Sequence, residues 1–269
     1  MKKVLVIIVI LLSVAIVVAG KLHWNNKIQA TVNTVHVEKT EKADVKTVAE
    51  ENQENKVQKV EAYSKNLSEE IQTKLIKAVQ DGVPVNLVIA GSSATPEDPL
   101  GWPSLLKKDL EDTYGEDVLN VTIKEIADKL STEVVQEELY QEIISLSPDI
   151  LLLEPFILTD NGKVTINNRL VNLTTIIDAI KVELPEVTVL LQPANPLHNA
   201  KHYPKEVGEL EKYANNNDYI YLNHWEAWPD YQTDEIKEYL LTNGSPNEKG
   251  QRLWADYLSN YFISEDAKE

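Results

Sequence analysis

The chain has 269 residues, and 26 Lys and Arg against 43 Asp and Glu give it a formal net charge of −17. This acidic balance argues against a nucleic-acid binder, because affinity for phosphate backbones depends on clustered cationic side chains. It also disfavours docking on anionic lipid. The chain has no cysteine, which excludes disulfides, thiolate metal sites and a cysteine nucleophile. With 43% hydrophobic residues, the chain can bury a core.

An uncharged apolar segment, residues 4–20, follows Lys2 and Lys3. As a helix it would span about 25 Å, which is long for the core of a signal peptide and just enough to cross a membrane. We therefore expect residues 1–20 to be a transmembrane anchor or a cleaved signal peptide, with the retained anchor favoured. The two lysines would hold the N-terminus inside, so that the domain is extracellular, or secreted after cleavage.

The composition changes after this segment. Residues 36–59 are rich in Glu, Lys, Asn and Gln, with isolated Val and no Gly or Pro. So few apolar side chains do not offset the conformational entropy of folding. Residues 21–67 are therefore predicted to be a polar stalk or linker, and residues 68–269 a single folded domain.

From residue 68 on, helical apolar patterns alternate with short apolar runs that are typical of buried strands. Strands are predicted at residues 85–90, 118–123, 149–154, 187–191 and 219–222. Helices are predicted around residues 71–79, 105–114, 132–146, 173–184, 203–215 and 247–262. Strands joined through helices favour right-handed crossovers. The predicted fold class is α/β, a three-layer α/β/α sandwich with a five-stranded parallel sheet.

In such a sheet, ligands bind outside the carboxyl ends of the strands. This rule selects the loops that begin at Gly91, Lys124, Glu154, Gln192 and Asn223. The loop before the last helix, residues 243–247, is expected to reach the same edge.

Two segments at opposite ends of this alternation resemble the SGNH (GDSL) hydrolase family. The first is Ile89-Ala90-Gly91-Ser92-Ser93-Ala94, where the family has Gly-Asp-Ser at the end of its first strand. The last is Gly244-Ser245-Pro246-Asn247-Glu248-Lys249-Gly250, which looks like the family's Pro-Asn-x-x-Gly block. The resemblance covers residues 83–262 and implies a flavodoxin-like sheet. It also implies a serine ester hydrolase without a cofactor, with Ser93 as nucleophile, acting on acyl or acetyl esters of cell-envelope or extracellular polymers.

The chain departs from the family pattern at its other signature positions. Ser92 stands where the family has Asp, and no glycine follows the second strand. Glu154 follows the third strand in place of the oxyanion asparagine, for which Asn161 is the nearest substitute. Thr242 and Ser245 occupy the slots of the family's Asp and His. A serine hydroxyl is a weak nucleophile without a base, and each oxyanion donor contributes ~3–4 kcal/mol. Either the activity is lost, or another residue supplies the base.

His224 is the candidate base, because it directly follows the fifth strand, and Glu226 or Glu154 could orient its ring. The alternative for His224 is a hydrogen bond to a backbone carbonyl, with no part in chemistry. Glu154 could be a general acid, or it could accept hydrogen bonds from the amides of the first loop and shape the cleft. His198 and His202 lie on a proline-flanked loop that suits chelation poorly, so no metal is expected.

Two functions remain open. The first is an exported ester hydrolase with Ser93, His224 and Glu154 as its catalytic residues. The second is a catalytically inactive SGNH-fold module that binds an envelope glycan or a protein partner in the same cleft. The expected ligand is an ester-bearing small molecule or an envelope glycan. No nucleic-acid partner is expected, membrane contact is expected through the N-terminal segment only, and the oligomeric state is left open.

Overall fold

The computed structural model describes the backbone of residues 41–264 and the side chains of residues 52–264. Contacts divide the chain into Met1–Asn52 and a compact unit, Gln53–Glu269, and the fold is that of the second unit. Its strands are β1 (Val85–Gly91), β2 (Leu119–Glu125), β3 (Ile150–Glu154), β4 (Thr188–Leu191) and β5 (Ile220–Tyr221). Its main helices are α3 (Glu69–Asp81), α4 (Trp102–Tyr114), α8 (Ile166–Glu183), α9 (Tyr203–Asn216) and α10 (Glu248–Phe262). Shorter helical segments are α5 (Ser131–Gln136), α6 (Tyr140–Ser145), α7 (Ile157–Asp160), η1 (His224–Ala227) and η2 (Asp234–Glu238).

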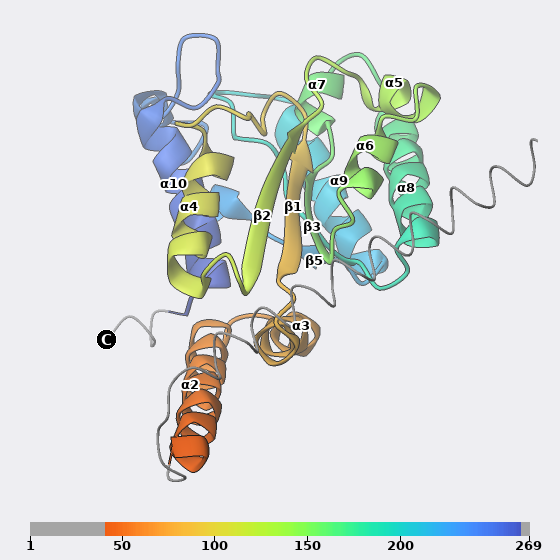
Figure 1. Cartoon of the computed structure of the whole chain (residues 1–269). Helices are drawn as coiled ribbons and strands as arrows, with labels where there is room; N and C mark the ends of the chain where they lie inside the picture. The colour runs from red at the N-terminus through yellow and green to blue at the C-terminus, as the bar shows by residue number, and fades with distance from the viewer. Residues whose placement is uncertain (1–40, 265–269) are drawn as a thin grey trace, which may run out of the picture. The chain divides into compact units, whose positions relative to one another are not determined.

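The five strands form one parallel sheet in the order β2-β1-β3-β4-β5. Helices α4 and α10 pack together on one face, and α6, α8 and α9 lie on the other (Figure 1). This arrangement confirms the predicted α/β fold with a five-stranded parallel sheet. The order of strands reverses direction between β1 and β3, and the loops that leave such a point diverge to form a ligand crevice.

The core explains why these segments fold as they do. Strands β1 and β3 are buried on both faces, as their nearly continuous apolar sequences require. Between α4 and α10, the fully buried rings of Trp102 and Trp254 stack with centroids 4.6 Å apart. This stack fixes α10, and therefore the loop before it, relative to the end of β1.

Two helices differ from their predicted form. The single helix predicted at residues 132–146 is wrong, because the chain breaks into α5 and α6 around Glu138, whose φ is 53°. A left-handed backbone at a residue other than glycine leaves no signal in the hydrophobic pattern. Helix α8 also begins at Ile166, well before residue 173, and Thr165 caps it by accepting a hydrogen bond from the backbone N–H of Asn168.

Packing on the domain begins before the boundary predicted at residue 68. Helix α2 (Glu41–Tyr63) runs through the expected linker, and Val60 and Leu67 are only 2% and 5% exposed. The side-chain amide of Gln53 donates to the backbone oxygen of Val79 at 3.2 Å. Residues 53–67 therefore contribute to the folded unit, because their few apolar side chains meet its surface.

The predicted anchor and export signal, residues 1–20, and residues 21–40 of the predicted stalk lie outside the described residues. Within residues 41–264, no helix combines the length and the apolar character that a membrane crossing needs.

Candidate functional site

The loop after β1 begins in very close contact with β3. Gly91 pairs in register with Glu154. A Cβ added at Gly91 would lie 2.4 Å from Oγ1 of Thr95 and 2.8 Å from Cβ of Glu154. No real Cβ makes contacts this short, so the loop can approach β3 in this way only with glycine at position 91.

Ser92 and Glu154 are buried together at the ends of β1 and β3. The Ser92 backbone N–H and hydroxyl both donate to Oε2 of Glu154, at 2.9 and 2.5 Å. Burial raises the pKa of Glu154 to about 7, although the hydrogen bonds from Ser92 oppose the rise. Glu154 thus holds the first loop in place, as the second of the two sequence interpretations expected. Its carboxyl is fully buried, so it does not face the cleft as a general acid would.

Ser93, the predicted nucleophile, is exposed and bonded to the loop that follows β2. Its Oγ accepts a hydrogen bond from the backbone N–H of Asp128 at 3.0 Å and lies 3.5 Å from the Asp128 carboxylate. Asp128 has a φ of 56°, a conformation that glycine adopts most readily. The sequence offered no glycine after β2, so this N–H next to Ser93 was missed.

His224 is fully buried, and neither Ser93 nor Glu154 is among its hydrogen-bond partners. Its Nε2 lies 2.9 Å from the carbonyl oxygen of Pro193, to which it must donate, and its Nδ1 accepts from Nε1 of Trp228 at 3.0 Å. The ring stacks on Trp254 with centroids 4.0 Å apart.

Burial lowers the pKa of His224 to about 3. Since both ring nitrogens are engaged and protonation is disfavoured, the geometry supports the structural interpretation of this histidine rather than its predicted role as a base. Glu226, one of its two expected orienting partners, bonds instead with the side-chain amide of Asn223 at 3.3 Å.

A cleft of about 260 Å³ opens at the carboxyl edge of the sheet. Its walls come from the loop after β1, helix α7, the loop after β4 and the segment before α10. They are formed by Ser92, Ser93, Ala94, Pro96, Leu158, Thr159, Asn195, Leu197, Asn243, Gly244, Ser245, Pro246 and Gln251. None of these thirteen residues carries a carboxylate, imidazole, amine or guanidinium, and the carboxylate of Asp128, which lies 3.5 Å from Ser93 Oγ, is not among them.

The cleft confirms that the two resembling segments meet. Ser93 from the first segment and Ser245 from the last line the same cavity, and the side-chain amide of Asn195 donates to the backbone oxygen of Gly244 at 2.9 Å. Thr242 lines a neighbouring cavity instead. Asn161, the nearest substitute for the oxyanion asparagine, ends helix α7 and does not line the cleft.

Leu158 and Thr159 were missed as site residues, because a four-residue helix such as α7 carries no periodic pattern. Among the described residues, no three His, Asp or Glu side chains gather in a way that could hold a metal ion.

The strand order and the meeting of the first and last segments at one cleft agree with the fold of the SGNH (GDSL) hydrolases. Comparisons with known proteins agree. A protein of the G-D-S-L family from Desulfitobacterium hafniense DCB-2 is 18% identical, with a TM-score of 0.54 over 66% of this chain and 99% of that one. A GDSL-like lipase from Bacteroides thetaiotaomicron is 13% identical, with a TM-score of 0.51 over 71% and 96%.

A carbohydrate esterase of family 3 from Talaromyces cellulolyticus is 11% identical, with a TM-score of 0.55 over 65% of this chain and 94% of that one. No protein-family model and no curated protein matches the sequence. The resemblance seen in the sequence is therefore confirmed in the fold, whereas identities this low carry no conclusion about activity.

Proposed function

We propose that this chain is an exported, membrane-tethered binding module on an SGNH hydrolase fold, and that its cleft binds a neutral unit of a cell-envelope glycan without cleaving it. One observation carries the proposal: none of the thirteen residues that line the cleft is titratable, and the one carboxylate bonded to the Ser93 hydroxyl, that of Asp128 at 3.5 Å, has no imidazole between it and the hydroxyl. A serine esterase needs a base that accepts the hydroxyl proton, and Ser245, which stands at the position of the family's histidine, cannot act as that base.

The lining supports a neutral, hydroxyl-bearing ligand. The hydroxyl-bearing Thr159 and the amide-bearing Asn195 and Gln251 line the cleft together with the apolar Leu197, whereas the Ser93 hydroxyl is already bonded to Asp128. Such groups both donate and accept hydrogen bonds, as a sugar ring requires. The volume of about 260 Å³ is below that of drug-sized sites, so one small unit of a longer chain fits best.

Tethering outside the membrane is supported by the N-terminal sequence alone, in which Lys2 and Lys3 precede an uncharged run. Protease added to intact cells should then remove the domain, and protection of the domain would contradict export.

The absence of catalysis is tested with a fluorophosphonate probe, which reacts with activated serines. We expect no labelling of wild type above that of Ser93→Ala. Ser245→His with Thr242→Asp restores the family's residues and should produce labelling and hydrolysis of p-nitrophenyl acetate at least about tenfold above wild type, since a placed base typically contributes ~10²–10⁴. Labelling of Ser93 in the wild-type chain would overturn the binding-module proposal in favour of an ester hydrolase.

Binding is tested with soluble oligosaccharides released from purified envelope polymer. Ser245→Tyr should abolish binding, because the new ring fills the cleft beside Ser93. Asn216→Tyr, at an exposed position at the end of α9, is the matched control and should bind like wild type. Ser93→Ala should leave affinity nearly unchanged. Equal binding by the Ser245→Tyr variant and wild type would show that the cleft is not the binding site.

A further inference from the structure

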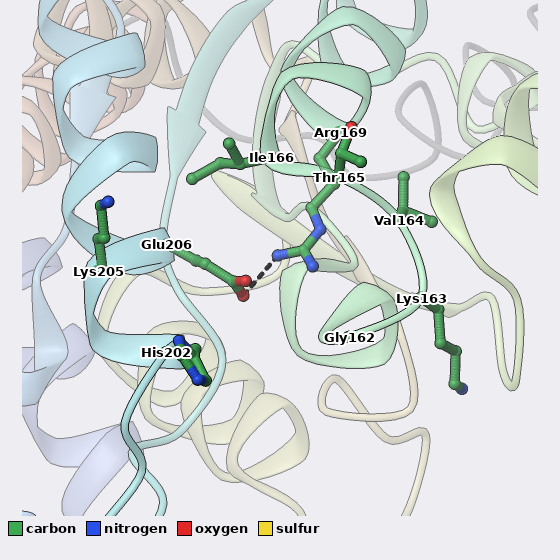
Figure 2. Close-up of a pocket in the computed structure, with 9 residues that line it drawn as sticks. All are labelled: Gly162, Lys163, Val164, Thr165, Ile166, Arg169, His202, Lys205 and Glu206. Carbon is green, nitrogen blue, oxygen red and sulfur yellow. Dashed lines mark ion pairs between the residues drawn. The ribbon is translucent and has the colours of Figure 1, made fainter.

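A second cavity, of about 390 Å³, lies between the first turns of α8 and α9. One wall is the segment 162–166, which follows α7 and leads into α8, and the other wall carries His202, Lys205 and Glu206 at the start of α9 (Figure 2). No residue is shared with the cleft around Ser93.

The charge of this cavity is opposite to that of the chain. Lys163, Arg169 and Lys205 line it with one carboxylate, Glu206, and a second carboxylate, Asp160, pairs with Arg169 from behind, so the two lysines supply its excess positive charge in a chain whose formal net charge is −17. Lys163, Lys205 and His202 are exposed, and the two lysine side chains, which extend away from the Arg169–Glu206 pair in Figure 2, would turn toward a bound group. A local excess of positive charge in an acidic protein concentrates anions at that point.

Both helices direct their amino ends at the cavity. Thr165 is the N-cap residue of α8 and His202 is that of α9, and both line the cavity. The His202 side chain makes no capping hydrogen bond. Several of the first N–H groups are already used or missing, since Thr165 caps Asn168 and Pro204 has no N–H, so the contribution of these helix ends to an anion is mainly that of the helix dipoles. Helices of 18 and 14 residues contribute together here.

Arg169 fixes a positive charge in the wall of the cavity. Its side chain is 4% exposed, and it reaches from α8 to form an ion pair with Glu206 of α9, with Nη1 2.5 Å from Oε2 (Figure 2). Its Nη2 donates to the backbone oxygen of Asp160 at 2.9 Å. Its Nε makes no hydrogen bond among the described residues but lies 3.9 Å from Oδ2 of the buried Asp160, a second ion pair. The ion pair with Glu206 therefore holds the two helix starts at a set distance, whereas the two lysines carry charge that a ligand can neutralise.

We propose that this cavity binds an oxyanion group, a carboxylate or a phosphate, of a small ligand or of an acidic unit in a polymer. Lys163 and Lys205 contact the group from the two walls, the His202 ring donates a hydrogen bond, and the amino ends of α8 and α9 supply the remaining attraction. The site is independent of the function proposed for the cleft.

The test titrates the full-length chain with inorganic phosphate, and in a second arm with succinate, at constant ionic strength, and follows the melting temperature. We expect a saturable rise with at least one of these probes, and the arm that binds more tightly identifies the group. In Lys163→Ala/Lys205→Ala, affinity should fall at least about tenfold, because two charges next to the anion are lost.

The matched control is Lys181→Ala/Lys212→Ala, which removes two exposed lysines from the same two helices outside the cavity. It should change affinity less than about twofold, since distant exposed charges are screened by salt. The proposal is overturned if neither probe saturates, if the cavity variant binds like wild type, or if both double variants weaken binding equally.

Discussion

The Ser92 hydroxyl donates a hydrogen bond of 2.5 Å to Oε2 of Glu154, and both residues are shielded from water. This contact joins the carboxyl ends of β1 and β3 at the point where the strand order reverses. The SGNH family has an aspartate at the Ser92 position, whereas here the carboxylate stands at the end of β3. The carboxyl group of Glu154 therefore holds the first loop in place and is not exposed to a substrate.

Glu154→Gln should change how stability depends on pH. Burial raises the folded-state pKa of Glu154 from 4.5 to about 7. Between these values the folded chain binds the proton and the unfolded chain does not, so wild-type stability falls as pH rises and levels off above about pH 7. The free energy of unfolding of the glutamine variant, relative to wild type, should rise by on the order of 3 kcal/mol across this window.

Urea unfolding at several pH values measures the difference. Glu183→Gln, at an exposed carboxyl at the end of α8, is the control and should show a constant difference from wild type. Parallel stability curves for the Glu154 variant and wild type would show that Glu154 is already ionised in the folded chain.

His224→Phe should reduce both stability and acid sensitivity. At neutral pH the variant leaves the Trp228 N–H and the Pro193 carbonyl without their partner, at a cost of about 1–3 kcal/mol each. Burial lowers the folded-state pKa of His224 to about 3, so wild type loses stability as pH falls from about 6.5. The variant should lose less over that range.

The same variant separates structure from catalysis. Any p-nitrophenyl acetate hydrolysis should proceed equally in folded His224→Phe and wild type, because the ring has no free nitrogen. A rate that falls as far as in Ser93→Ala would instead establish His224 as the base.

Gly91→Ala and Gly208→Ala should have opposite effects. The new methyl group at position 91 would lie 2.4 Å from Thr95 Oγ1, and the resulting overpacking should cost about 1–3 kcal/mol of unfolding free energy. At Gly208, inside α9, no atom lies within 4 Å of the added Cβ, so alanine should stabilise the chain by up to about 1 kcal/mol. Thermal unfolding measures both changes, and equal effects would mean that the loop at Gly91 rearranges freely.

Two truncations should locate the start of the folded unit. A chain that begins at Gln53 should keep the melting temperature of the full-length protein, since the compact unit begins there. A chain that begins at Ser68 should melt several degrees lower, because it loses Val60 and Leu67, which are buried. Identical melting temperatures for the two truncated chains would show that residues 53–67 do not stabilise the domain.

The sequence by itself determined the five strands, most of the helices and the edge of the sheet where a site lies. These features are local, since an apolar run such as residues 149–154 forms a buried strand in almost any packed α/β sheet. The meeting of Ser93 with Ser245 could also be predicted, because carboxyl ends of parallel strands share one edge.

Only the tertiary structure decided what the site residues do. The role of His224 depends on Pro193 and on Trp254 from α10, both distant in the sequence: the Pro193 carbonyl accepts the hydrogen bond from Nε2, and the Trp254 ring stacks on the imidazole. The cavity between α8 and α9 likewise depends on Arg169 meeting Glu206, 37 positions further along the chain. Hydrogen bonding and desolvation are set by the neighbours that folding brings together, and a linear pattern of residue types does not specify them.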